Sequence, residues 1–312
     1  MTIDLFTYTY NLVRQIPDGK VSTYGAVAEA LGNKVASRAV GRMMNQNPNA
    51  DTMPCYKIVH SDGRLGGFGG HPEDKIKRLG KVGIQVKDGK LVDFESVFFN
   101  DFTTEYPLKK LRQEQIKESK DLILTDDFEK IETIAGIDVA YPESEWEDAC
   151  AVAVVIDYAT GERVEEKTIL APTRFPFIST YFSYREFPLV ERVFKVLTTK
   201  PSILLLDGNG ILHPYTTGFA SHAGLRLDIP TIGVAKTLLY GKQKNHTIFI
   251  DNEPRGCALI PKSATTPIYV SPGHRISLET SVSLVQQLCL TKNPVPLRYA
   301  HQLAQERLQK HG

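Results

Sequence analysis

The sequence predicts two domains: a mainly α-helical domain over residues 1–98, and an α/β domain with a central mixed sheet over residues 99–312. Three observations support this fold class. A length of 312 residues is long for one compact core and comfortable for two. Helical periodicity dominates the first hundred residues, whereas strand-like apolar runs alternate with helices from residue 131 onward. Residues 96–108 fit no period and form the best candidate linker.

Short helices and tight turns make up the N-terminal domain. Apolar residues at helical spacing predict a helix over residues 2–17, and a basic helix is expected over residues 74–80. Helix boundaries rest on caps and breakers: Ser22 or Thr23 before the second helix, Gly32-Asn33 after it, and Ser37 before a third helix that ends near Asn45. Two helices joined by a short glycine turn are typical of a helix-turn-helix. A small hairpin is expected around Asp88-Gly89.

The C-terminal domain begins with a charged helix from Leu108 to about Leu122 and continues with strands. ETIAGIDVAY, ACAVAVVIDY and TGERVEEKTIL predict three consecutive strands that form an antiparallel meander. SILLLDGNG, TIGVAK and PIYVSPG are short apolar runs typical of buried strands. Helices are expected over residues 186–198, 277–290 and 296–310.

Composition excludes several classes of protein. The net charge of +1 divides into +3 over residues 1–100 (13 basic, 10 acidic) and −2 over residues 101–312 (24 basic, 26 acidic), so neither half is strongly basic. The four cysteines form no CxxC pair, which argues against a zinc site. The sequence has no signal peptide and no apolar run long enough to span a membrane. We therefore expect a cytoplasmic protein that binds no membrane and needs no obligate protein partner.

One cysteine stands in an informative context. Cys55 follows Pro54 and precedes an apolar run; a cysteine considered alone is more often a buried structural thiol. However, VSTYGAVAEALG, SRAVGRMMNQNP, PCYKIV and GRLGGFGG occur in this order over residues 1–85. This half of the chain resembles the active-site and DNA-binding domain of the O(6)-alkylguanine-DNA alkyltransferases. The resemblance implies a winged helix-turn-helix-like fold and a cofactor-free, irreversible transfer of an alkyl group from guanine to Cys55.

The same resemblance implies a DNA-contact role for other residues. Arg38 would enter the base stack in place of the flipped nucleotide, and Tyr24 would contact that nucleotide's phosphate. Asn47 would brace the turn that carries Cys55. The remaining expected DNA-binding residues are Ala39 and Gly41, which keep the recognition helix close to the groove, and Lys57.

Two departures from that family concern the activation of the thiol. Tyr56 stands where the family has a histidine, and Val82 where it has a glutamate, so the usual base relay is missing. Lys57 is expected to favour the thiolate electrostatically instead. The alternative is that the N-terminal domain only binds alkylated DNA without repairing it.

Three carboxylates in the second domain suit a metal site. Asp138 lies within an apolar strand, Asp207 ends another strand, and Glu186 opens a helix. A charge inside an apolar strand is costly unless it is paired or binds a cation. Carboxylates from separate elements are the hard ligands that Mg²⁺ prefers. Each residue alone has a structural explanation, but together they predict a magnesium site.

Five ordered motifs then resemble the endonuclease V family. They are GIDVAY, FPFISTYFSYREFP, LLLDGNGILHP, GFASHAGLRLDIPTIGVAKTLL and YVSPGHRISL, within residues 106–296. The resemblance implies an RNase H-like domain that uses Mg²⁺, with Mn²⁺ as a substitute. It would nick double-stranded DNA at the second phosphodiester 3′ to deoxyinosine. A preference for inosine in RNA stays open. The expected partner of the whole chain is double-stranded DNA with alkylated guanine or deaminated bases.

This resemblance also assigns roles within the second domain. Asp138, Glu186 and Asp207 would hold the metal, and Lys236 and His274 would complete the catalytic group. The strand-separating wedge would consist of Pro176, Phe177, Ile178 and Ser179. The base pocket would be lined by Thr180, Tyr181, Phe182 and Gly208. His213 and His222 would contact phosphate or the metal shell, and a purely structural role is equally open for both.

Overall fold

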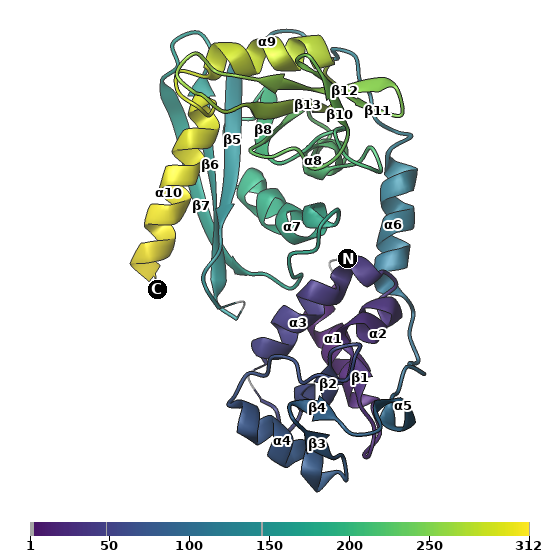
Figure 1. Cartoon of the computed structure of the whole chain (residues 1–312). Helices are drawn as coiled ribbons and strands as arrows, with labels where there is room; N and C mark the ends of the chain where they lie inside the picture. The colour runs from purple at the N-terminus through teal and green to yellow at the C-terminus, as the bar shows by residue number, and fades with distance from the viewer. Residues whose placement is uncertain (1–2, 48, 145, 312) are drawn as a thin grey trace. The chain divides into compact units, whose positions relative to one another are not determined.

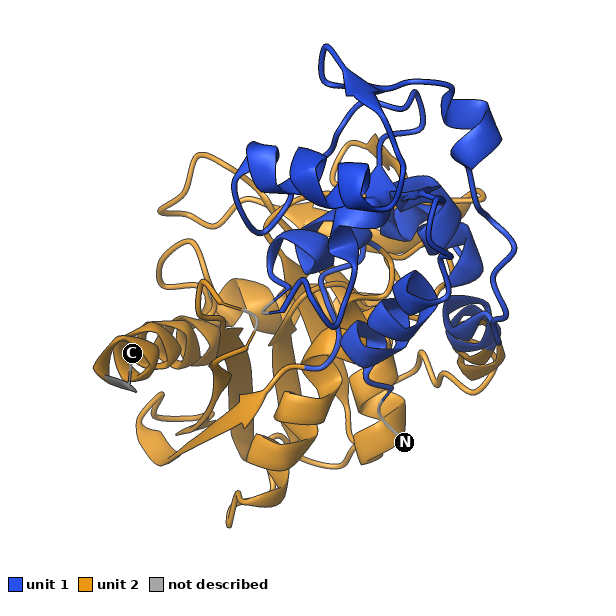
Figure 2. Cartoon of the chain, turned by 90° about the horizontal axis from the view of Figure 1, so that it is seen from below, with its two compact units in different colours: residues 1–113, 174–179 blue, residues 114–173, 180–312 orange. Residues whose placement is uncertain are grey.

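The computed structural model of the protein describes residues 3–47, 49–144 and 146–311. It divides into two compact units, which Figure 2 colours separately. The first unit runs to Gln113 and includes Arg174–Ser179, and the second contains the remaining residues. The division falls inside helix α6 (Pro107–Glu118). The predicted domain limits at residues 98 and 99 stay a prediction.

Helices with identifiable caps form the first unit (Figure 1). Helix α1 (Leu5–Arg14) begins after Asp4, whose carboxylate accepts a hydrogen bond from the Thr7 amide at 2.9 Å. Thr23 caps the next helix in the same way through the Ala26 amide at 3.0 Å, as predicted. The further elements are α2 (Tyr24–Ala30), η1 (Lys34–Ala36), α3 (Ser37–Asn45), η2 (Cys55–Lys57), α4 (Pro72–Lys81) and α5 (Phe94–Val97).

The expected cap at Ser37 was wrong. Its hydroxyl donates to the Lys34 carbonyl oxygen at 2.7 Å, and no side chain caps α3. The reason is that the 3₁₀ turn η1 runs directly into α3, so Ser37 is already part of a helical turn. Four short strands complete the first unit: β1 (Ser22–Thr23), β2 (Ile58–Val59), β3 (Val86–Lys87) and β4 (Lys90–Leu91).

The predicted hairpin lies between β3 and β4. Asp88 and Gly89 connect these strands with φ angles of 50° and 73°, the left-handed geometry that a two-residue hairpin turn requires. Strands β1 and β2 pair in parallel. A winged helix-turn-helix remains a prediction for this unit.

A nine-stranded mixed sheet organises the described part of the second unit, in the order β10-β11-β12-β13-β9-β8-β5-β6-β7. The predicted antiparallel meander is confirmed, and β8 and β9 then add in parallel beside β5. The strands are β5 (Thr133–Ala140), β6 (Asp148–Asp157), β7 (Arg163–Pro172), β8 (Ile203–Asp207), β9 (Thr231–Ala235), β10 (Lys242–Lys244), β11 (Thr247–Ile250), β12 (Glu253–Leu259) and β13 (Ile268–His274).

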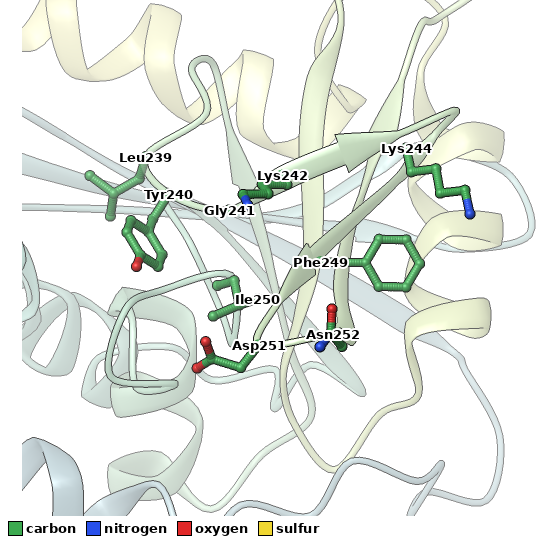
Figure 3. A pocket seen from close by; sticks show the side chains of 9 residues that line it. All are labelled: Leu239, Tyr240, Gly241, Lys242, Lys244, Phe249, Ile250, Asp251 and Asn252. Carbon is green, nitrogen blue, oxygen red and sulfur yellow. The ribbon is translucent and has the colours of Figure 1, made fainter.

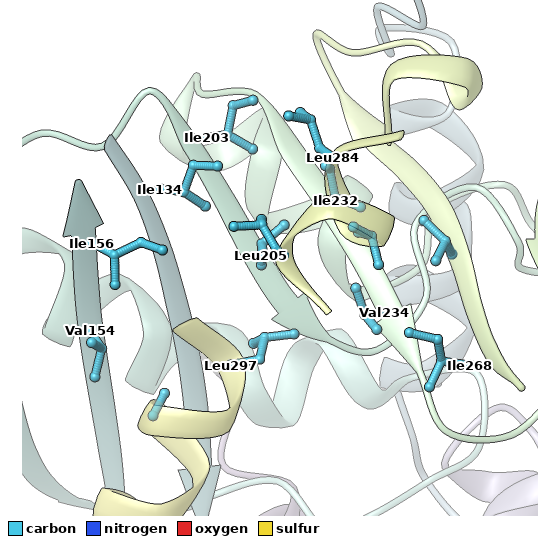
Figure 4. Close-up of a cluster of buried hydrophobic side chains, with 14 of the residues drawn as sticks. Ile134, Val154, Ile156, Ile203, Leu205, Ile232, Val234, Ile268, Leu284 and Leu297 are labelled. Atoms are coloured by element: carbon cyan, nitrogen blue, oxygen red, sulfur yellow. The ribbon is translucent and has the colours of Figure 1, made fainter. Parts of the chain in front are cut away.

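Helices cover both faces of this sheet (Figure 1). They are α7 (Phe182–Lys195), α8 (Phe219–Leu227), α9 (Leu278–Leu288) and α10 (Val295–His311). Figure 4 shows the core on one face, which contains Leu284 of α9, Leu297 of α10 and Leu205 of β8. Leu189 of α7 and Ala220 of α8 belong to the core on the other face. In the stretches that the structure describes, no helix is long and apolar enough to cross a membrane.

Candidate active sites

Cys55 lies in a buried turn that Asn47 holds in place. The side chain of Cys55 is only 1% exposed. Asn47 donates from Nδ2 to the Met53 carbonyl oxygen at 2.8 Å and to Cys55 Sγ at 3.0 Å. The bracing geometry that the sequence suggested for Asn47 is therefore present. Burial raises the pKa of the Cys55 thiol, while the hydrogen bond from Asn47 counteracts this effect.

The cation that lowers the pKa of the Cys55 thiol most is Lys75. The expectation that Lys57 favours the thiolate was wrong. The Lys57 ammonium donates to the Ile16 carbonyl oxygen at 2.9 Å and to the Asp18 carboxylate at 2.9 Å, so its charge is already satisfied. Lys57 is also buried, which removes it from a DNA-contacting surface. Lys75 on α4 is buried as well, and its charge lowers the pKa of Cys55. Burial in turn lowers the pKa of Lys75 to about 8.

Lys75 is positioned by backbone carbonyl groups. Its Nζ donates to the carbonyl oxygen of Ile58 at 2.7 Å and to that of Gly66 at 3.1 Å. Arg78, one turn further along α4, lies over the Tyr56 ring at 5.9 Å and also lowers the thiol pKa. Two cations from α4 therefore act where the sequence lacks a histidine relay. Val82 packs in the small core that includes Tyr56.

The predicted DNA-contact residues lie on α2 and α3. Arg38 is exposed on α3, and the neighbouring Ala39 is buried. Tyr24 donates from its hydroxyl to the Gly67 carbonyl oxygen at 3.1 Å. A Cβ at Gly41 would lie 3.7 Å from the Tyr24 ring, an ordinary van der Waals distance, so Gly41 of α3 lies beside the tyrosine.

Asp138 and Asp207 stand side by side on neighbouring parallel strands. Ile137 of β5 pairs with Leu206 of β8, so the next residue on each strand is an aspartate. Adjacent strands lie about 4.8 Å apart, and paired residues project from the same face. Burial raises the pKa of Asp138, and the negative charge of Asp207 adds to this shift.

Glu186 brings the third carboxylate from α7. It is 5% exposed, and burial raises its pKa to about 8, with further contributions from the charges of Asp138 and Asp207. The Tyr141 hydroxyl and the Arg185 guanidinium oppose this shift. Arg185 lies 4.0 Å above the centre of the Tyr141 ring. The helix thus carries both the carboxylate and the cation beside it.

Lys236 and His301 pair with the two aspartates. Lys236 donates from Nζ to Asp207 Oδ2 at 2.5 Å. Burial opposes the charge of Lys236, but the two aspartates outweigh burial and raise its pKa. His301 of α10 lies with Nδ1 2.8 Å from Asp138 Oδ2. His301 was missed by the sequence analysis, because it stands in an amphipathic helix far from the recognised motifs.

The close approach of α10 to β5 places His301. A Cβ at Gly136 would lie 2.4 Å from the Pro296 carbonyl carbon and 2.5 Å from the Leu297 nitrogen. Only glycine therefore allows the start of α10 to rest on the strand. His301 follows Leu297 by about one helical turn, and Asp138 follows Gly136 by two residues, so this contact sets their distance.

His274 is offset from the two aspartates along the strand direction, and its expected catalytic role stays a prediction. His274 pairs with Thr231 at the start of β9, and Thr231 pairs with Leu204 on β8. It is therefore level with a residue three positions before Asp207, about 10 Å away along the strand direction. His274 is buried, and its Nδ1 accepts a hydrogen bond from the Ile123 amide at 3.3 Å. This histidine joins β13 to the chain that follows α6.

Hard oxygen ligands are present, but two of the carboxylates are engaged with other side chains of the protein. Within residues 3–47, 49–144 and 146–311, no group of three or more His, Cys, Asp or Glu side chains is arranged so that it could hold a metal ion. Lys236 and His301 instead pair with Asp207 and Asp138. The chemistry of the donors still suits a hard divalent cation, because Asp138, Glu186 and Asp207 are carboxylates, and the negative charges of the two aspartates act on Glu186.

The predicted wedge and base pocket are partly exposed. Residues 174–179 belong to the first compact unit, where Phe177 is 55% exposed while Pro176 and Ile178 are buried and Ser179 is half-buried. Of the four residues expected to form the wedge, Phe177 is thus the one whose side chain is exposed. In the second unit, Thr180 adopts a φ of 67° just before the buried Tyr181.

Two of the residues expected in the base pocket lie close together: Gly208, directly after Asp207 in the chain, and Phe182 on α7. A Cβ at Gly208 would lie 3.0 Å from the Phe219 ring and 3.6 Å from the Phe182 ring. These two rings pack edge to face with their centres 5.4 Å apart. Gly208 therefore keeps the backbone that follows β8 close to the rings of Phe182 and Phe219.

The two other histidines expected at the site, His213 and His222, are buried and contact other residues of the protein. His213 accepts a hydrogen bond at Nδ1 from the Tyr215 amide at 3.3 Å. His222 lies 2.8 Å from the Glu118 carboxylate and packs against the Phe187 ring. His222 therefore joins α8 to α6, and its expected contact with phosphate or the metal shell stays a prediction.

Family models and relatives agree with this picture. The model described as "Endonuclease V" matches residues 116–302, and "6-O-methylguanine DNA methyltransferase, DNA binding domain" matches residues 4–84. A "Bifunctional methyltransferase/endonuclease" of Picrophilus torridus is 38% identical over 300 residues, covering 96% of this chain and 95% of that protein. The protein of the same description from Thermoplasma volcanium is 38% identical over 312 residues, covering 99% and 92%.

A solved structure matches the second unit. The endonuclease V of Ciona intestinalis, in complex with DNA containing an inosine followed by a ribo-adenosine, has a TM-score of 0.62 and 28% identity. The match covers 67% of this chain and 100% of that protein. Both resemblances found in the sequence are confirmed. The chain therefore belongs to the endonuclease V family and, over nearly its whole length, to the bifunctional methyltransferase/endonucleases.

Proposed function

We propose that the second unit nicks DNA at the second phosphodiester on the 3′ side of deoxyinosine, with Mg²⁺ bound by Asp138, Glu186 and Asp207. The observation that carries this proposal is the meeting of three carboxylates from β5, α7 and β8. The endonuclease V family depends on metal ions. Bound there, the metal would activate water and stabilise charge on the phosphate.

The protein's own residues would prepare this site. His301 holds the Asp138 carboxylate, and Lys236 holds Asp207 with a cation that also suits a phosphate oxygen. Phe177 would occupy the space of the extruded base, and the rings of Phe182 and Phe219 beside Gly208 would receive that base.

The test uses a duplex with one deoxyinosine, labelled at the 5′ end of the damaged strand. With Mg²⁺ the wild type should give one product that ends one nucleotide beyond the lesion, and EDTA should abolish it. Asp207→Asn should remove the product. Cleavage that ignores inosine, or that persists in EDTA, contradicts the proposal.

We also propose that the first unit transfers an alkyl group from O(6)-alkylguanine to Cys55. The Cys55 thiolate would attack the alkyl carbon while the bond from that carbon to guanine O6 breaks. The electron pair stays on guanine O6, and guanine is restored when its N1 takes up a proton, which balances the proton that the thiol has lost. Asn47 and Lys75 support the proposal because both lower the pKa of the buried thiol. Mass spectrometry of the Cys55 peptide after incubation with O(6)-methylguanine duplex should find one added methyl group.

A binding-only role is the alternative for the first unit. Tyr56 replaces the usual histidine, and the pKa of Cys55 is raised overall, so the thiolate is scarce at neutral pH. Under this alternative the Cys55 peptide stays unmodified, while binding still prefers the alkylated duplex. Slow methylation that accelerates with pH supports transfer.

An RNA substrate is the alternative for the second unit. The Ciona intestinalis complex contains DNA in which a ribo-adenosine follows the inosine. Competition between equal concentrations of inosine-containing DNA and RNA decides between them. Preferential cleavage of the RNA strand would replace deoxyinosine DNA as the principal substrate.

A further inference from the structure

A groove at the edge of the large sheet lies outside the sites described above. It has a volume of about 1000 Å³, and Figure 3 shows the side chains that line it. They come from the segment that leads into β10, from the β10–β11 pair and from the turn after β11. Strand β10 pairs only with β11 and ends the sheet. One side of the groove is therefore an edge strand.

The register of the two strands places two lysines and an aromatic ring on the outer face. Lys242 pairs with Phe249, and Lys244 follows Lys242 by two residues. Directly paired residues and residues two apart share a face of the sheet. The intervening Ile248 is fully buried on the opposite face. Lys242, Lys244 and Phe249 therefore border the groove.

Tyr240 supplies a second aromatic ring. Its side chain is 52% exposed, and Figure 3 shows it on the opposite side of the group from Phe249. The adjacent Gly241 has a φ of 108°, and a Cβ there would lie 2.9 Å from both Ile248 and the Phe249 carbonyl oxygen. This turn needs glycine, so the position of Tyr240 is fixed by the backbone.

The groove is positively charged and adjoins the carboxylate site. Residues 236–252 contain three lysines and one aspartate, although the chain from residue 101 onward is acidic overall. Lys236, which contacts Asp207, precedes Tyr240 by four residues. Four residues span at most about 14 Å, so a strand held at the carboxylates can continue into the groove.

We propose that this groove binds a single-stranded stretch of the nucleic acid beside the position of cleavage. Lysines that neutralise phosphates, combined with exposed aromatic rings on which bases stack, are the features of sequence-independent single-strand binding. Lys242 and Lys244 contact successive phosphates, and Tyr240 stacks on a base. The proposal rests on the nuclease function proposed above, since the strand that enters the groove is the one to be cut.

Edge protection is the competing explanation for the lysines. Lysines on an edge strand also discourage pairing with another chain. That role requires no ligand, gives Tyr240 no function and predicts no change in nucleic-acid binding when the lysines are removed.

The test measures binding of a labelled single-stranded oligothymidylate to the full-length protein in EDTA at a series of salt concentrations. Lys242→Ala and Lys244→Ala should each reduce the slope of log affinity against log salt by about 0.7. Tyr240→Ala should weaken binding at least about fivefold, while Tyr240→Phe keeps the stacking ring and the wild-type affinity. Lys200→Ala is the matched control, because this exposed lysine precedes the far end of β8.

Two results would overturn the proposal: salt slopes in the lysine variants equal to that of wild type, or equal affinities of Tyr240→Ala and Tyr240→Phe. Nicking of deoxyinosine duplex by the wild type is measured in parallel. If the wild type nicks and the slopes do not change, the groove proposal is wrong and the nuclease stands. If the slopes change but inosine is not recognised, the groove binds nucleic acid and the nuclease proposal is wrong.

Discussion

His301 Nδ1 lies 2.8 Å from Asp138 Oδ2, which joins helix α10 to strand β5 of the nine-stranded sheet. The contact depends on Gly136, because a larger residue there would collide with the backbone of Pro296. A histidine that holds a carboxylate in this way orients it to bind a metal ion. The predictions below follow from this contact and from the charges around both sites.

His301→Ala should weaken metal binding at the nuclease site. Loss of a side chain that orients a metal-binding carboxylate typically costs about 10–100-fold in metal affinity or activity. The Mg²⁺ concentration that gives half-maximal nicking should therefore rise, and excess Mg²⁺ should restore part of the rate. His274→Gln is the control, and its Mg²⁺ dependence should match that of wild type. A metal dependence in His301→Ala identical to wild type would contradict this account.

Gly136→Ala should disrupt the packing of α10 and reduce nicking. The added Cβ would lie 2.4 Å from a backbone carbon, so the helix must shift. Overpacking of this kind costs about 1–3 kcal/mol of stability. Thermal unfolding and nicking rate are the measurements. Gly80→Ala, where no heavy atom lies within 4 Å of the new Cβ, is the control and should leave both values unchanged or slightly raise stability.

The metal-free protein should lose stability as pH rises toward and through about 8. Burial raises the pKa of Glu186 from 4.5 to about 8 in the folded state. Between these values the folded state keeps a proton that the unfolded state releases, so increasing pH disfavours folding. Melting temperature should fall more from pH 5 to pH 9 in wild type than in Glu186→Gln, which cannot ionise. Parallel curves for the two proteins would contradict a raised Glu186 pKa.

Lys75→Met should move alkyl transfer to higher pH. The Lys75 charge lowers the pKa of the Cys55 thiol, so its removal leaves less thiolate at neutral pH. The rate of Cys55 methylation should rise with pH in both proteins. The rise should occur at higher pH in the variant than in wild type. Lys57→Met is the control, because the Lys57 ammonium is engaged with Ile16 and Asp18. An unshifted Lys75→Met profile would exclude this electrostatic role.

Local patterns in the sequence were enough to predict much of the fold. Thr23 caps α2, Asp88-Gly89 forms the hairpin turn, and the meander pairs as expected. Asp138 and Asp207 could be predicted to meet because parallel strands place their carboxyl ends at one edge. In each case the determinant lies within a few residues of the element that it specifies.

Contacts between distant segments could not be predicted in this way. His301 is brought to Asp138 by a close approach at Gly136, and no periodicity reports such an approach. Lys57 and His274 stand beside recognised motifs, but hydrogen bonds direct Lys57 to Asp18 and bring the Ile123 amide to His274. Strands β10 and β11 are short, and β12 begins with exposed residues, so none of them forms a long apolar run in the sequence.

The most direct test of two separate sites uses one duplex that carries both an O(6)-methylguanine and a deoxyinosine. Wild type, Cys55→Ser and Asp207→Asn are compared for methylation of the Cys55 peptide and for Mg²⁺-dependent nicking. Cys55→Ser should nick at the wild-type rate without accepting methyl, and Asp207→Asn should accept methyl without nicking. If either substitution abolishes both activities in a folded protein, the claim of two independent sites is wrong.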